Sequence, residues 1–162
     1  MELDTLFGLP AHPLIVHAVV VLVPLAAIGG IAIAVSAWVR AHIGWLVVAF
    51  AVAGVVLVPL ATGSGEALEE STEESALLEE HTEMGEQLMP WMIALALGTV
   101  AVMVLARVVS RLPSGAEAPG WAAHWVVIAV AVVTVVAATG TLVQVTRIGH
   151  SGAKATWSED AG

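Results

Sequence analysis

Four long apolar runs decide what this chain of 162 residues can fold into. They occupy residues 13–39, 43–62, 88–109 and 121–147 and contain almost no ionisable side chains. A helix of about 20 residues crosses the ~30 Å hydrocarbon core of a bilayer. Because backbone polar groups in lipid must be paired within the protein, runs of this length are expected to be helical. The sequence therefore predicts an all-α fold, an integral membrane four-helix bundle.

Composition supports lipid as the main surroundings of the chain. Hydrophobic residues make up 59% and charged residues 12%, whereas soluble domains carry about 25% charged residues. The net charge of −9 argues against nucleic acid as a partner. The chain has no cysteine, which excludes disulfides, iron–sulfur clusters, thiolate zinc sites and covalently attached haem. We expect the lipid bilayer to be its principal partner.

The runs divide the chain into a single transmembrane domain over residues 1–162. An acidic, partly helical segment is predicted at 63–87, between the second and third spans, and a tail at 148–162. The connection at 40–42 is so short that the first two spans should be antiparallel neighbours. Small residues within the runs should let the helices approach closely. These are Gly29, Gly30, Gly44, Gly54, Gly98 and Gly140.

The basic residues of the loops predict the orientation. Arg40, Arg107 and Arg111 lie at one end of the predicted bundle, and Arg147 and Lys154 at the other. Loops rich in Lys and Arg stay in the cytoplasm. We therefore expect both termini and the acidic segment to be extracytoplasmic.

Four of the six histidines are predicted to lie at this outer end. Counting along each helix at about 1.5 Å per residue from Trp and Arg residues at the inner boundary brings them to one level. They are His12, His17, His81 and His150, whereas His42 and His124 lie at the inner end. Because neutral imidazole is the commonest protein ligand of metals, this grouping indicates either bis-histidine haem b or a His/Glu metal site.

For haem b, the expected axial ligands are His17 with His81 or His150, and His12 is a further candidate. Gly85 follows His81 by one turn, and its missing side chain would let a flat macrocycle approach. Arg147 precedes His150 by about one turn and would neutralise a propionate or pair with the acidic segment. The predicted function is then electron transfer by a haem bound at the outer helix ends.

Two other functions stay open. The first is a non-haem zinc, copper or iron site, in which glutamates join the same histidines. Its candidate ligands are His12, His17, His81, His150, Glu66, Glu80 and Glu83. The second is a non-catalytic assembly subunit, whose acidic segment docks a partner and whose histidines only form hydrogen bonds. The sequence shows no nucleophile–base arrangement, and the glycines at 63–65 lack a Walker lysine, so we do not expect a conventional enzyme.

Several stretches of the chain are similar to a known family. They read GLPAHPLIVHAVVVLVPLAA (8–27), LATGSGEALEE (60–70), LLEEHTEMGEQL (77–88) and RIGHSGAKATW (147–157). Together they resemble the bacterial four-span membrane family catalogued as domain of unknown function 2231. The resemblance implies a multi-pass protein of the bacterial inner membrane. Fusion of some family members to Rieske-type or cytochrome c domains implies electron transfer, with redox partner proteins. A homo-oligomer stays open.

Overall fold

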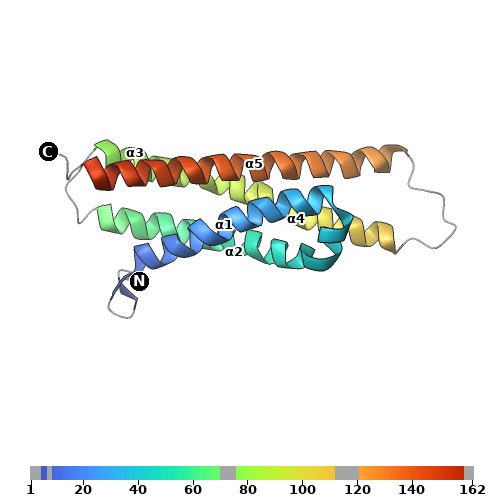
Figure 1. Ribbon diagram of the computed structural model, residues 1–162, viewed down its shortest axis with the longest axis horizontal. Coiled ribbons are helices and arrows are strands. Elements are labelled where there is room, and N and C mark those ends of the chain that lie inside the picture. Colours follow the sequence, from blue (N-terminus) through green and yellow to red (C-terminus); the bar gives the residue numbers. More distant parts are fainter. Residues whose placement is uncertain (1–4, 7–8, 70–75, 112–120, 159–162) are drawn as a thin grey trace.

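Helices account for nearly all of the structure. The computed structural model describes residues 5–6, 9–69, 76–111 and 121–158. The helices are α1 (Ala11–Val35), α2 (Ala37–Glu69), α3 (Ala76–Glu86), α4 (Leu88–Ser110) and α5 (Trp121–Ser158). Two short strands that the sequence analysis did not predict, β1 (Thr5–Leu6) and β2 (Leu9–Pro10), pair antiparallel before α1. The helices run along one long axis, as Figure 1 shows, and the all-α prediction is confirmed.

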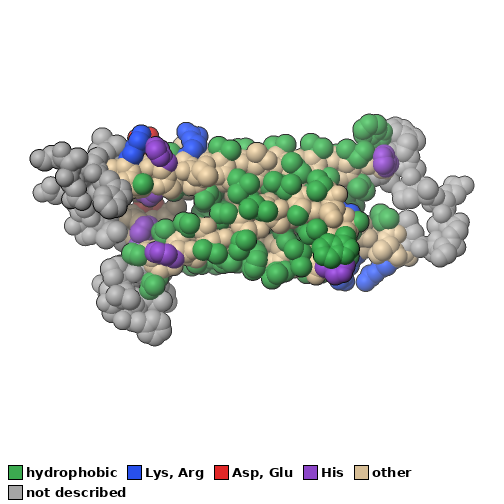
Figure 2. Space-filling view, viewed as in Figure 1, with side chains coloured by type: hydrophobic (Ala, Val, Ile, Leu, Met, Phe, Trp, Pro, Cys, Tyr) green, Lys and Arg blue, Asp and Glu red, His purple; other side chains and the backbone are tan. Residues whose placement is uncertain are grey.

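The described residues include four stretches that are long and apolar enough to span a membrane. They are His12–Val35, Ala37–Glu66, Glu79–Ser110 and His124–Lys154. One third or less of each apolar window is buried within the bundle. The rest of each window forms an apolar outer surface, which Figure 2 shows along the length of the molecule. Such a surface is stable against acyl chains but not against water.

The turn between α1 and α2 lies at Ser36, whereas the sequence analysis had expected it at 40–42. Ser36 acts as the cap of α2, because its Oγ accepts a hydrogen bond from the backbone N–H of Val39 at 3.3 Å. Arg40 then donates to the carbonyl of Ile33 at 2.7 Å. Carbonyls in the last turn of a helix lack partners within it, so Arg40 stabilises the end of α1.

Two helices run further than the predicted spans. Helix α2 continues to Glu69 and takes in the start of the 63–87 segment. Helix α5 continues to Ser158 and takes in most of the 148–162 tail. Serines in both extensions donate to their own helix, Ser64 to the carbonyl of Ala61 and Ser151 to that of Ile148. Residues 70–75 of the acidic segment lie outside the described part.

The acidic segment joins the third span through a break at Gln87, between α3 and α4. Pro90 follows three residues later. It has no N–H for the carbonyl of Glu86 and its ring crowds that carbonyl, which favours a break or kink of the helix at this point. Gln144 of α5, which is 4% exposed, donates from Nε2 to the nearby carbonyl of Met84 at 2.9 Å. This hydrogen bond ties the end of α3 to α5.

The core consists of small and branched side chains. Its larger cluster is centred on Val23, Met92 and Leu95. A smaller cluster surrounds Ile33 and Met103. The predicted close approach of helices at glycine is confirmed, most clearly at Gly98. A Cβ built there would lie 2.7 Å from Oγ1 and 3.2 Å from the backbone Cα of Thr134, so α4 and α5 meet backbone to backbone.

Candidate functional site

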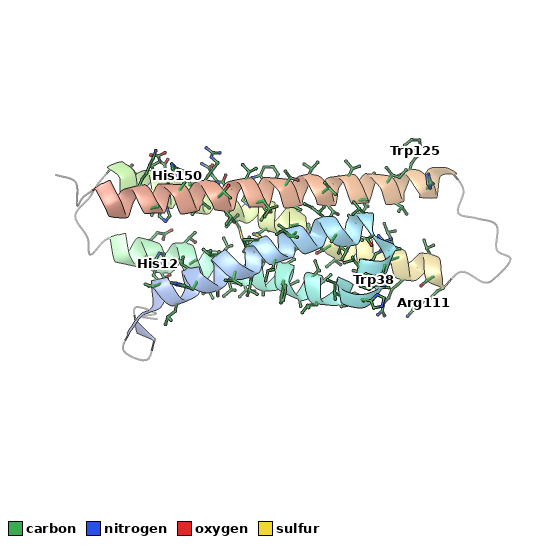
Figure 3. All side chains as sticks on the ribbon, in the orientation of Figure 1. His12, Trp38, Arg111, Trp125 and His150 are labelled. Atoms are coloured by element: carbon green, nitrogen blue, oxygen red, sulfur yellow. The ribbon has the colours of Figure 1, made fainter. Side chains whose placement is uncertain are left out.

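The histidines lie at the two ends of the bundle. His12 and His150 lie at one end and Trp38, Arg111 and Trp125 at the other, as Figure 3 shows. We call the first the histidine end. His17 follows His12 on α1, and His81 contacts Ser151 beside His150. The four histidines expected at one level therefore do share one end of the molecule.

His12 connects the start of α1 to the end of α2. Its Nδ1 lies 3.1 Å from the carbonyl oxygen of Ala61 and 3.1 Å from Oγ of Ser64. A carbonyl can only accept, so Nδ1 carries the proton and donates it. The ring also packs on Gly65, where a built Cβ would lie 3.1 Å from Cε1 of His12. A larger residue there would push the ring away from α2.

His81 makes the same kind of connection between α3 and α5. Its Nδ1 lies 3.0 Å from Oγ of Ser151. Because that hydroxyl donates its own hydrogen to the carbonyl of Ile148 at 2.9 Å, it accepts from the imidazole. The ring packs on Gly152, where a built Cβ would lie 2.9 Å from Cε1 of His81.

The two connections repeat one arrangement, which we call the His–Ser–Gly contact. In each, a histidine from one helix donates to a serine on another, and the glycine after that serine makes room for the ring. Neither this repeat nor the roles of its serines and glycines were predicted from the sequence; these residues are Ser64, Gly65, Ser151 and Gly152. The available signal was the Ser-Gly dipeptide, which recurs near the ends of the second and fourth spans.

The remaining predicted residues lie apart from these contacts. His17 is exposed, and its Nδ1 donates to the carbonyl of Pro13 in its own helix. Gly85 faces α2, with Cγ2 of Thr62 3.5 Å from its built Cβ. Glu66 and Glu83 are both exposed. The structure thus brings His12 and His81 into helix contacts but not His17.

His150 and Arg147 line a pocket on the surface formed by α3 and α5. Its volume is about 170 Å³, and Glu80, Met84, Ser151 and Lys154 are the other described residues that line it. Arg147, His150 and Lys154 are all exposed. The lining does not include His12, His17 or His81. Across the described residues, no three His, Asp or Glu side chains come together in a way that could hold a metal ion.

Four apolar membrane-spanning helices with polar contacts at one end define an integral membrane four-helix bundle. Over residues 8–162 the chain matches the family described as "Predicted membrane protein (DUF2231)". It belongs to that family, as the resemblance in its sequence implied. Comparisons with curated proteins and with solved structures give no match.

Proposed function

We propose that this membrane protein binds haem b for electron transfer, with His12 and His81 as its axial ligands. The observation that carries the proposal is the repeated His–Ser–Gly contact. Both rings are partly buried and held against a neighbouring helix, whereas His17 and His150 are exposed. Of the axial ligands expected from the sequence, the proposal therefore retains His81. His12, the further candidate, replaces His17 and His150.

The chemistry of the two imidazoles fits an axial ligand. Histidines that bind metals usually donate Nδ1–H to an oxygen, which fixes the ring and makes Nε2 the coordinating nitrogen. His12 donates in this way to Ala61 and Ser64, and His81 to Ser151. The glycines beneath the rings allow both histidines to adopt these positions.

The number of protein ligands favours haem over a non-haem ion. Haem supplies four nitrogens itself and needs only one or two axial side chains. A structural zinc ion needs about four protein ligands and a catalytic one about three. Within the described residues there is no group of three candidate ligands, but two imidazoles, those of His12 and His81, are held by hydrogen bonds. A zinc, copper or iron ion bound with Glu66 or Glu83 is therefore the second candidate.

A bound haem would supply one-electron chemistry. The protein would hold the imidazoles, exclude water from them and keep both in the neutral Nδ1–H form. Three of the five basic residues, Arg40, Arg107 and Arg111, lie at the far end of the bundle. Because loops rich in Lys and Arg stay in the cytoplasm, this distribution would place the histidine end outside it. Redox partners would then meet the protein on the extracytoplasmic side of a bacterial inner membrane.

Spectroscopy and elemental analysis of the full chain in detergent test the proposal. We expect a Soret band and reduced-minus-oxidised difference bands, with about one iron per chain. A stoichiometric zinc, copper or iron ion without haem absorbance would support the second candidate instead. Absence of both, even after reconstitution with haem, would overturn both and favour an assembly subunit.

A further inference from the structure

The pocket between α3 and α5 concentrates positive charge in an acidic protein. The chain has five Lys and Arg residues and a net charge of −9. Arg147 and Lys154 nevertheless both line this pocket, with His150 between them along α5. The spacing is two helical turns, so the three side chains share one face of the helix. Among the described residues, Glu80 is the one carboxylate in the lining, against the two cations Arg147 and Lys154, so this described part of the lining has a net positive charge.

The position of the pocket matches the level of lipid headgroups. The apolar part of α5 ends just before Arg147, and the candidate span itself ends at Lys154. Figure 2 shows Lys and Arg side chains next to a histidine at this end of the molecule, beyond the apolar surface. Basic pockets between transmembrane helices on the cytoplasmic side bind anionic headgroups, and the same pairing of charges is open to anionic headgroups of the outer leaflet.

The size and lining of the pocket restrict its ligand further. A volume of about 170 Å³ is below the roughly 300–1,000 Å³ of pockets that take drug-sized ligands, so the pocket suits a small charged headgroup. A guanidinium binds phosphate oxygens in pairs, and an ammonium binds them as a point charge. Met84 adds an apolar wall, which suits the glycerol and first methylenes of a lipid.

We propose that Arg147, His150 and Lys154 form a binding site for a phosphate group, supplied by an anionic phospholipid. The site is separate from the His–Ser–Gly contacts but borders one of them. Ser151 lines the pocket and also accepts the hydrogen bond from His81. A phospholipid here would therefore lie directly beside the hydroxyl that positions His81.

The test is binding of phosphatidylglycerol to the full chain in detergent, measured by native mass spectrometry. Each Lys or Arg near an anionic lipid surface strengthens binding about fivefold. Arg147→Gln should therefore weaken binding about fivefold, and the double variant Arg147→Gln/Lys154→Gln about 25-fold. The matched control is Arg111→Gln, which removes the same charge at the far end of the bundle and should bind as the unchanged protein does.

Wild-type affinity in the double variant would overturn the proposal. If Arg111→Gln lost as much affinity for phosphatidylglycerol as Arg147→Gln, the proposal would also be overturned, because the effect would then reflect net charge alone. Inorganic phosphate is the competing probe. If millimolar phosphate fails to displace the lipid, the result supports a phospholipid as the natural ligand of the site. If phosphate displaces the lipid, the result supports a phosphate site whose ligand is a soluble phosphate. The melting temperature of each variant shows that the fold is retained.

Discussion

At the scale of single residues, burial separates histidines that share one level of the membrane. His12 and His17 are five positions apart, so at about 100° per residue their side chains point about 140° apart around α1. One ring packs against α2 and the other is exposed. Height along a helix follows from sequence position, but the direction of a ring follows from how neighbouring helices pack. That is why His17 was preferred from the sequence and His12 is preferred from the structure.

The serine of each His–Ser–Gly contact should matter for any ligand held by the histidine. Ser151→Ala removes the oxygen that accepts from Nδ1 of His81. Loss of such an outer hydrogen bond typically lowers metal affinity about 10–100-fold. We expect this loss in haem titrations of Ser151→Ala, and a smaller one in Ser64→Ala, because His12 keeps the carbonyl of Ala61 as an acceptor.

Ser110→Ala is the matched control for both variants. Ser110 also donates to a carbonyl in its own helix, that of Arg107, but it lies at the end of α4 away from the His–Ser–Gly contacts. Equal haem affinity in Ser151→Ala and Ser110→Ala would contradict a positioning role for Ser151.

At the scale of helices, the lipid surroundings make the four spans predictable from the sequence, but not the residues at which the helices end. An apolar run in a bilayer has no alternative to helix, which is why the four spans agree with the sequence analysis. Polar residues beyond the runs give no such constraint. Ser64 and Ser151 satisfy their hydroxyls on their own helices, and α2 and α5 continue without a break into the acidic segment, predicted to be partly helical, and into the predicted tail. The cap at Ser36 was likewise missed, because apolar residues stand on both sides of it and residues 13–39 form one unbroken run.

The packing of α4 on α5 gives a prediction independent of any ligand. Gly98→Val would place new atoms against Thr134, within 3.2 Å of its backbone Cα. Overpacking of this kind costs about 1–3 kcal/mol, so the variant should unfold at lower denaturant or temperature. The control is Leu97→Val, because Leu97 is 67% exposed and faces lipid. Equal stability of both variants would contradict the packing described here.

At the scale of the whole molecule, two helical hairpins, α1–α2 and α4–α5, are joined by the acidic segment, and one His–Ser–Gly contact lies in the first hairpin while the other ties the acidic segment to α5. The first contact joins α1 to α2 and the second joins α3 to α5. The sequence hides this repeat because the partners are 52 and 70 positions apart. Only the Ser-Gly dipeptides recur visibly. The candidate site could therefore be predicted as a region but not as a set of contacts.

The orientation of the molecule can be measured with single cysteines, because the natural chain has none. Three basic residues at the far end against two at the histidine end predict an extracytoplasmic histidine end. A cysteine at Glu66, which is exposed on α2, should react with an impermeant maleimide in intact cells. A cysteine at Ser110 should react only after permeabilisation, and the reverse pattern would contradict the orientation.

One series of difference spectra tests most directly the proposal that His12 and His81 would hold haem b. The purified chain should show the bands of a low-spin bis-histidine haem. His12→Ala and His81→Ala should each lose or shift those bands, whereas His17→Ala and His42→Ala should keep them. A spectrum without haem bands after reconstitution, or one unchanged by His12→Ala and His81→Ala, would contradict the account.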